Sequence, residues 1–413
     1  MRSDILHRLR ETRVLENYSY MTALNILSAL IGLIIYPYVI RATGKDAFGT
    51  YVYAFTIASF FQVLIDYGFD SPGAKAIVQA NEDVMERSRI VTSVLLLKTG
   101  LIVISGILFS LCLHFIPFMH ANRLLCLITF TQLAIGSLFP VWYFQGMKKM
   151  KWVTYINLSL RLCTIPLILL FIHSAQDINS YAFIVMISIV LGTGIAYIFL
   201  AKDGIRFASI SSHRLKTLLS DATPFFATAV TGNLKSLSVK TLIKIHFGVG
   251  DVAVYDLAEK IITIPRFFTQ NINGALFPEV VNNATPERVK RIFKYEHLIG
   301  IAFTIIIALL SYPMVLILGG EQMMDAVWVT IMLSTTIYTW LVVGAYINFV
   351  FIPAGKYYII TLNQLIAFLS CVLLAYCGLF LWQDISVVTA GVMISGFIEM
   401  IFCRYISKHY KLL

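Results

Sequence analysis

Runs of about 20 apolar residues recur along the whole chain, and this repetition limits what it can fold into. A run of that length crosses a hydrocarbon core of roughly 30 Å as an α-helix. Hydrophobic residues make up 58% of the 413 residues and charged residues only 13%, a balance far from that of an ordinary soluble domain. The sequence therefore predicts an all-α, polytopic membrane protein.

We predict 12 membrane-spanning helices in two lobes of six. The predicted spans are 20–41, 50–72, 90–115, 123–146, 152–173, 181–201, 222–246, 252–275, 297–318, 326–353, 357–381 and 385–404. The predicted parts of the chain are a cytoplasmic interfacial segment (1–19), an N-terminal lobe (20–201), a cytoplasmic linker (202–220), a C-terminal lobe (221–405) and a cytoplasmic tail (406–413).

Basic residues are distributed unevenly between the two sides of these spans. The chain carries 32 Lys and Arg against 22 Asp and Glu, a net charge of +10. If the N-terminus lies inside, the outer segments hold only Arg41, Lys45 and Arg123, while most other basic residues lie in inner segments. This asymmetry obeys the positive-inside rule. It predicts cytoplasmic termini, and it attributes the positive charge to topology and not to a nucleic-acid partner.

Charged stripes mark residues 233–273, which we predict to form two membrane helices joined by an outer turn at 248–251. At about 100° per residue, the polar side chains of each helix share one face. The stripes are Asn233, Ser236, Lys240 and Lys244 on the first helix, and Asp256, Glu259, Lys260, Thr263, Arg266, Gln270 and Asn273 on the second. Ionisable groups at membrane depth are costly unless paired or hydrated. These faces are therefore predicted to line a polar path through the bilayer.

Narrower polar stripes occur on the first two predicted helices. They are Thr22, Asn25, Ser28, Gly32 and Tyr36, followed by Ser59, Gln62, Asp66 and Asp70. Together, the four striped helices predict a central polar cavity. Two structural alternatives stay open: Asp256 and Lys260 have the i, i+4 spacing of an ion pair within one helix, and Asp66 and Asp70 have Arg266 or Lys98 as possible partners.

A weak internal repeat relates the two lobes. Gly44, Gly49, Tyr51 and Ala54 align at a constant offset with Gly248, Ala253, Tyr255 and Ala258. Because six helices separate the copies, both lobes have the same orientation, related by an axis along the membrane normal. Transporters often follow such a plan, with the site between the halves.

Neither a metal site nor a catalytic centre is indicated. The six cysteines lie in apolar spans without metal-ligand spacing, so no metal is expected. No cofactor and no enzymatic activity are expected either. Trp142 and Tyr143 lie at a predicted inner membrane boundary, where aromatic anchors are common; a sugar-stacking platform is the alternative.

Several motifs resemble the bacterial polysaccharide-repeat flippases, the O-antigen and capsule translocases of the Wzx type. The motifs are PVWYFQGMKKM (140–150), FGTY (48–51), LLSDATPFF (218–226), VAVYDLAEKI (252–261) and LFP (276–278). These flippases belong to the superfamily that also contains the multidrug and toxic-compound extruders and the lipid II flippases. The chain departs from the usual pattern at Lys148, where an acidic residue often stands, and at KDAFG (45–49).

The resemblance implies a function, a substrate and a location. It implies movement of an undecaprenyl-pyrophosphate-linked oligosaccharide from the inner to the outer leaflet of the bacterial cytoplasmic membrane, by alternating access. The implied partners are that substrate, membrane lipids, H⁺ or Na⁺ as a coupling ion, and polysaccharide polymerase machinery.

The expected roles of the striped residues follow from that substrate. For the pyrophosphate and sugar we expect Lys240, Lys244, Lys260, Arg266, Asn25, Gln62 and Asn233, and for gating or ion coupling Asp66, Asp70, Asp256 and Glu259. Lysine and arginine hold phosphate oxygens through charge-assisted hydrogen bonds.

Two other functions remain as alternatives. A cation-coupled multidrug extruder of the same fold predicts a smaller, acidic, aromatic-lined pocket, which the basic residues of 233–273 disfavour. A membrane enzyme, such as a polysaccharide polymerase or an acyltransferase, predicts a long outer loop or a catalytic cluster at one membrane face, and the sequence indicates neither.

Overall fold

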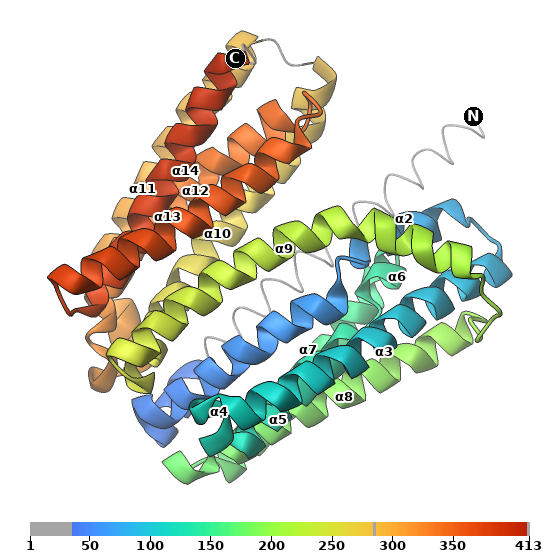
Figure 1. The fold of residues 1–413 in the computed structure, drawn as a ribbon, viewed down its shortest axis with the longest axis horizontal. Coiled ribbons are helices and arrows are strands. Elements are labelled where there is room, and N and C mark those ends of the chain that lie inside the picture. The colour runs from blue at the N-terminus through green and yellow to red at the C-terminus, as the bar shows by residue number, and fades with distance from the viewer. Residues whose placement is uncertain (1–34, 284–285, 411–413) are drawn as a thin grey trace. The chain divides into compact units, whose positions relative to one another are not determined.

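The computed structural model describes residues 35–283 and 286–410, and within these ranges it contains helices and no strand (Figure 1). The helices are α2 (Asp70–Gln79), α3 (Val84–Phe115), α4 (Pro117–Ala121), α5 (Arg123–Ser137), α6 (Val141–Gly146), α7 (Met150–Phe171), α8 (Ile178–Lys202), α9 (Ser212–His246), α10 (Val249–Asn283), α11 (Pro286–Gly319), α12 (Ala326–Tyr346), α13 (Tyr357–Leu381) and α14 (Ile385–His409). Short 3₁₀ turns precede α8 (Ala175–Asp177) and α12 (Glu321–Met323), and a π-helical turn (Ile347–Phe351) follows α12.

The all-α, polytopic membrane fold is confirmed, whereas the number of spans stays a prediction. In the described ranges, nine helical segments are long and apolar enough to cross a membrane. One of them, Ile35–Gln79, has 45 residues. At 1.5 Å per residue such a segment would measure about 68 Å as one straight helix, which is twice a bilayer core. It is therefore not one straight helix: left-handed residues interrupt it at Gly44, Tyr67 and Gly68.

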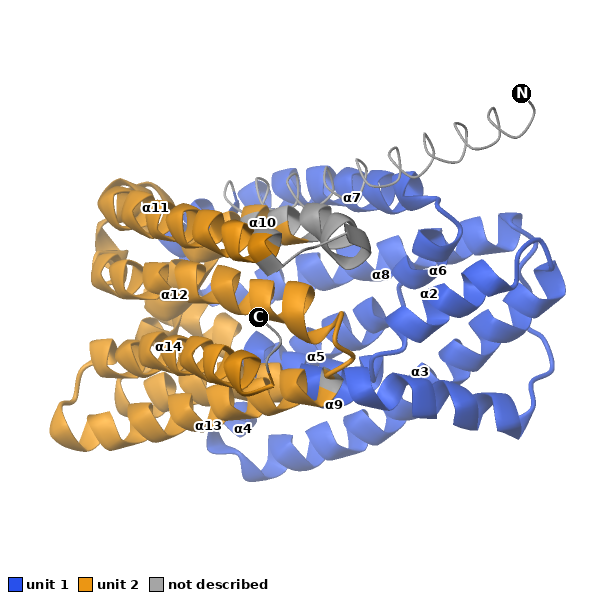
Figure 2. Cartoon of the chain, turned by 90° about the horizontal axis from the view of Figure 1, so that it is seen from above, with its two compact units in different colours: residues 1–43, 54–230 blue, residues 44–53, 231–413 orange. Residues whose placement is uncertain are grey.

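The chain forms two compact units (Figure 2). Among the described residues, unit 1 contains 35–43 and 54–230, and unit 2 contains 44–53 and the described residues from 231 onwards. The chain passes from one unit to the other inside α9, between residues 230 and 231, which is later than the predicted linker at 202–220. Part of that linker, from Ser212, already belongs to α9.

Unit 1 has a core built around the short helix α6. In this unit α2 packs against α6, and α8 packs against both α5 and α7. Trp142, Tyr143 and Phe144 of α6 are all at most 3% exposed. A Cβ at Gly73 of α2 would come within 2.9 Å of the Trp142 ring, so only glycine allows this contact. Trp142 and Tyr143 are thus core side chains, so the prediction of interfacial anchors and the alternative of a sugar-stacking platform were both wrong.

Unit 2 is organised around α12, which packs against α10, α11 and α14. Glycines allow its neighbours to approach closely, as small residues do in membrane helix pairs. A Cβ at Gly300 of α11 would lie 3.0 Å from the Tyr338 ring, and a Cβ at Gly396 of α14 would lie 2.5 Å from Thr339 Oγ1. The core of unit 2 therefore requires the backbones of α11 and α14 to approach α12 closely.

The two glycines that begin the internal repeat share an unusual backbone conformation. Gly44 has φ 78° and Gly248 has φ 108°, in the left-handed region that glycine adopts without strain. Gly248 separates α9 from α10, as expected for the predicted turn at 248–251. A Cβ at Gly49 would lie 1.8 Å from the carbonyl oxygen of Val249, so the segment 44–53 is fitted tightly against this turn within unit 2.

A second structural repeat precedes α7 and α13. Lys148 (φ 55°) and Gly355 (φ 68°) are both left-handed. The next amide in each case, from Lys149 or Lys356, donates to a carbonyl five residues earlier, at 2.8 and 2.9 Å. This is the pattern of a Schellman helix end, where glycine is usual. Lys148, which departs from the usual motif, therefore occupies a position that costs a side chain energy.

Candidate functional site

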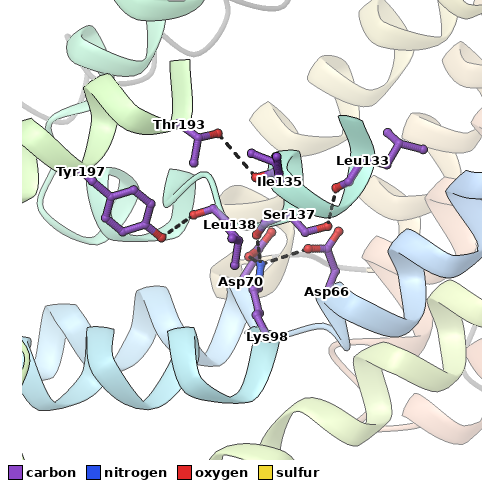
Figure 3. A network of polar contacts seen from close by, with 9 residues as sticks. All are labelled: Asp66, Asp70, Lys98, Leu133, Ile135, Ser137, Leu138, Thr193 and Tyr197. Carbon is purple, nitrogen blue, oxygen red and sulfur yellow. Dashed lines mark hydrogen bonds and ion pairs between the residues drawn. The ribbon is translucent and has the colours of Figure 1, made fainter. Parts of the chain in front are cut away.

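A buried ammonium group holds two carboxylates together in unit 1 (Figure 3). Lys98 of α3 is 2% exposed, and its Nζ lies 3.0 Å from Asp66 Oδ1 and 3.3 Å from Asp70 Oδ1. Nζ also donates to the carbonyl oxygen of Ser137 at 2.7 Å. These three acceptors match the three hydrogens of the ammonium group, so Lys98 is saturated in this arrangement.

The third acceptor, the carbonyl oxygen of Ser137, lies at the C-terminal end of α5. Helix α5 ends at Ser137, and Pro140 follows without an N–H to continue the ladder. The last carbonyls of a helix carry partial negative charge and need outside donors. Lys98 supplies one, and the hydroxyl of Tyr197 on α8 supplies another by donating to Leu138 at 2.7 Å. The buried lysine thus joins α3, α5 and the helix break that carries the two aspartates.

That break is strained and is held by α9. Residues 35–66 are helical and α2 begins at Asp70, while Tyr67 (φ 45°) and Gly68 (φ 75°) are both left-handed. Left-handed φ is rare for a bulky side chain. The Tyr67 ring stacks on Phe226 with centroids 4.4 Å apart, and a Cβ at Gly68 would come within 2.6 Å of Phe225. Contacts from α9 therefore fix the break between Asp66 and Asp70.

Unit 2 contains a second cluster with the same composition. Lys240 of α9 is 6% exposed, and its Nζ lies 2.8 Å from Asp256 Oδ1 and 2.9 Å from Glu259 Oε2. Both carboxylates belong to α10. The ion pair therefore joins α9 to α10. Lys240 lies one helix turn before Lys244, and both precede the turn at Gly248.

Each cluster combines one ammonium with two carboxylates, for a formal charge of −1. In each cluster one carboxylate side chain is more exposed than the other: Asp70 is 61% exposed against 33% for Asp66, and Glu259 is 32% exposed against 8% for Asp256. In both units the lysine joins neighbouring helices, and one of its two carboxylates is partly exposed.

These pairings resolve the two alternatives that the sequence left open. Asp66 and Asp70 both pair with Lys98, within unit 1. Asp256 pairs with Lys240 on the neighbouring helix, and not with Lys260 within its own helix. Lys260 is exposed, and among the described residues no ion pair joins it to a carboxylate.

The remaining expected site residues lie as follows. Lys244, Gln62 and Asn233 are half-buried. Arg266 of α10 donates to Thr336 Oγ1 at 2.5 Å, and its guanidinium lies 4.8 Å from the centre of the Trp340 ring, both on α12. Asn25 lies outside the described residues.

The sequence analysis missed one polar cluster in unit 2. Lys235 Nζ lies 3.1 Å from Glu399 Oε1, and Asn363 Nδ2 donates to the other carboxylate oxygen at 3.4 Å. The Cys403 thiol donates to Asn363 Oδ1 at 3.4 Å. Lys235 points away from the stripe of its helix, and Glu399 is the lone acidic residue of its span. Two isolated opposite charges in separate spans are the signal that would have paired them.

A cavity of about 770 Å³ lies in unit 1 between α2, the start of α3 and the start of α9. Its lining carries Lys75, Glu86, Arg214 and Asp221, so the two positive and two negative groups balance. Arg214 Nη2 lies 2.6 Å from Glu86 Oε1. The cavity therefore shows no preference for an anion.

Outside the membrane spans, burial shifts one carboxyl group at the α9–α10 turn. Burial raises the pKa of Asp251, and its neighbours Asp325, Asp46 and Asp384 add to the increase, while Lys45 opposes it. Repulsion between these negative charges therefore destabilises this end of unit 2.

A family model described as "Polysaccharide biosynthesis protein" matches residues 14–283, which is more than half of the chain. The chain belongs to this family. The predicted resemblance is thus confirmed, and the matched residues include all of α2 to α10.

Known proteins similar to this polysaccharide biosynthesis family member agree with that assignment. A protein of Escherichia coli (strain K12), described as a candidate O-antigen transporter, is 25% identical over 326 residues, covering 77% of this chain and 78% of its own. A protein of Shigella dysenteriae with the same description is 24% identical over 256 residues, covering 61% of this chain and 63% of its own.

Solved structures show the same fold. The lipid II flippase MurJ, in an inward closed conformation, matches with a TM-score of 0.75 and 14% identity, over 94% of this chain and 87% of its own. An inward-facing multidrug resistance transporter of the MATE family matches with a TM-score of 0.71 and 14% identity, over 94% and 95%. At this identity the likeness shows the fold alone.

Proposed function

We propose that this protein moves an oligosaccharide linked to undecaprenyl pyrophosphate from the inner to the outer leaflet of the cytoplasmic membrane. The observation that carries the proposal is membership of the polysaccharide biosynthesis family, supported by two relatives described as candidate O-antigen transporters. The product would feed the assembly of a surface polysaccharide, where a membrane polymerase is the expected partner.

The proposed mechanism is alternating access without covalent chemistry. The pyrophosphate and sugar pass through a polar path while the polyprenyl tail stays in lipid, because an unpaired charge in hydrocarbon is costly. The helix break at Tyr67 and Gly68 supports a mechanism with two conformations, since strained residues often mark places that change shape.

We assign the pyrophosphate to the cations of α9 and α10. Lys244, Lys260 and Arg266 are the residues we expect to contact it, and Lys240 is the fourth cation. In the described state Lys240 is neutralised by Asp256 and Glu259. Lys240 reaches the anion only when its carboxylates are released, so we propose that it acts late in the cycle.

The polar neutral residues of the stripes are assigned to the sugar. Amides such as Gln62, Asn233 and Asn25 both donate and accept hydrogen bonds, as sugar hydroxyls do. We assign gating to the partly exposed carboxylates of Asp70 and Glu259, because each can exchange its lysine for another partner as the units move.

The test is restoration of a surface polysaccharide in living cells. The gene would be expressed in a bacterium that lacks its own O-antigen flippase and that makes the repeat unit of the source strain. We expect surface polysaccharide to return, whereas an empty vector leaves the repeat unit on the cytoplasmic side. A full-length, membrane-inserted protein that restores nothing with its own repeat unit would contradict the proposal.

The same cells also test the alternative. Because the fold is shared with multidrug transporters, resistance to cationic dyes would be measured in parallel. Resistance gained without restored polysaccharide would favour the extruder.

A further inference from the structure

Among the described residues, one buried carboxyl group of unit 2 has no hydrogen-bond partner. Glu296 lies on α11 and is 1% exposed. Both of its oxygens are buried and make no hydrogen bond, and none of the described ion pairs includes it. Buried carboxyl groups without a hydrogen bond are rare in folded proteins, and each calls for an explanation.

The contacts of α11 with α12 show what surrounds this group. The Phe293 ring lies 4.6 Å from the Tyr346 ring, and Gly300 packs against Tyr338. Glu296 comes three residues after Phe293 and four before Gly300, so all three share one helix face. Glu296 therefore faces α12 between these two contacts, level with Val342, which is fully buried.

The titratable and polar groups near this site are engaged elsewhere or are neutral. His297, on α11 itself, bonds through Nδ1 with the Tyr338 hydroxyl at 2.9 Å. On α12 the nearby groups are Tyr338 and Tyr346, and on α14 Arg404 acts electrostatically on both tyrosines and on His297. On α10, Asn273 also has a buried, unpartnered side-chain oxygen. None of these donates a hydrogen bond to Glu296.

A carboxylate anion in such surroundings is strongly unfavourable, whereas the neutral acid is tolerated. The unpaired state therefore carries a proton on one carboxyl oxygen. An ionisable residue inside a membrane protein, kept without a structural partner, most often marks a pathway for ions or protons. Packing alone does not require an acid at this position.

We propose that Glu296 is a proton-binding site of unit 2, loaded in the conformation described here and emptied when α11 and α12 separate. The proton passes from the carboxyl oxygen to a water molecule, leaving the carboxylate and a hydronium ion, and it returns by the reverse step. The exposed side chain of Lys294 lies within one helix turn, and because its ammonium group requires hydration, the route to water is short. This inference rests on the proposed function, and it names H⁺ as the coupling ion.

Infrared spectroscopy of the purified full-length protein tests the site directly. At neutral pH we expect a protonated-carboxyl band in the wild type that is absent from Glu296→Gln, and that disappears as the pH rises. The Gln variant mimics the neutral acid in size and should fold normally. If the two proteins show the same protonated-carboxyl band, Glu296 is ionised and the proposal is overturned.

Transport in membrane vesicles tests the coupling. We expect collapse of an imposed pH gradient to slow wild-type transport of the lipid-linked oligosaccharide several-fold, and to leave Glu296→Gln unaffected. Glu296→Asp, which keeps a proton-binding group, should retain the response. Glu287→Gln is the matched control, because Glu287 is an exposed acid on the same helix, and it should behave as the wild type.

The outcomes separate the two proposals. A Glu296→Gln protein that still responds fully to the gradient overturns the proton site and leaves the flippase standing. If the wild type moves no lipid-linked oligosaccharide, the proposed function fails, and the infrared titration alone decides whether Glu296 binds a proton.

Discussion

Replacing Lys98 with methionine should destabilise unit 1 strongly. The substitution keeps the length of the side chain but removes an ammonium that lies 3.0 Å from Asp66 and 3.3 Å from Asp70. Breaking a fully buried ion pair typically costs about 3–5 kcal/mol, because the partner charge is left bare. The two aspartates are 33% and 61% exposed, and water compensates part of that charge. We therefore expect a loss of roughly 2–3 kcal/mol.

The assay is thermal unfolding of the purified protein in detergent, followed by tryptophan fluorescence. Lys98→Met should lower the midpoint by several degrees, whereas Lys75→Met, at an exposed position on α2, should leave it unchanged. Adding Asp66→Asn and Asp70→Asn to Lys98→Met should recover much of the loss, because no charge then remains unpaired. If Lys98→Met unfolds at the wild-type temperature, the cluster does not hold the helices together.

Three further predictions follow from particular residues. Asp251→Asn should raise the midpoint at pH 7 and lose this advantage below about pH 4, because a carboxyl with a raised folded pKa costs stability only where the unfolded chain is ionised; an unchanged midpoint at pH 7 would contradict this. Lys148→Val should cost about 1–2 kcal/mol, since a β-branched residue is disfavoured at left-handed φ, while Lys148→Gly should not destabilise; equal midpoints for both variants would rule out strain. In a cysteine-free protein, a cysteine at Ser236 should react with a hydrophilic maleimide faster than one at Ile262, which is 1% exposed; equal rates would mean that the stripe does not face water.

Much of the helical framework could be predicted from the sequence. The apolar runs identify the helices because length and hydrophobicity alone decide whether a segment can span a bilayer. The turn between α9 and α10 was predicted at 248–251, and the structure adds the left-handed φ of Gly248. In each case the decisive signal is local in the sequence.

Features that depend on tertiary contacts could not be predicted. The helix break at Tyr67 lies inside a continuous apolar run, and it is fixed by Phe225 and Phe226, more than 150 positions away. Similarly, the break between α5 and α6 divides a run predicted as one helix. Periodicity carries no information about such distant contacts.

The residues of the Lys240 cluster could be predicted from the sequence but their pairing could not, and their part in a functional site stays a prediction. The stripes placed Lys240, Asp256 and Glu259 on facing surfaces, yet nothing in the sequence decides which lysine a carboxylate meets. The choice depends on a few ångströms of helix offset and rotation, and here it favours Lys240 over Lys260.

The most direct test of the central claim is transport by the purified protein alone. The full-length chain would be reconstituted into liposomes containing an undecaprenyl-pyrophosphate-linked oligosaccharide, and a lectin or glycosidase would report the fraction of sugar exposed on the outer leaflet over time. We predict that the wild type exchanges the sugar between leaflets, and that neutralising Lys244, Lys260 and Arg266 together slows this exchange at least tenfold without loss of folded protein. If the wild type exchanges sugar no faster than empty liposomes, the protein is not a flippase for this class of lipid.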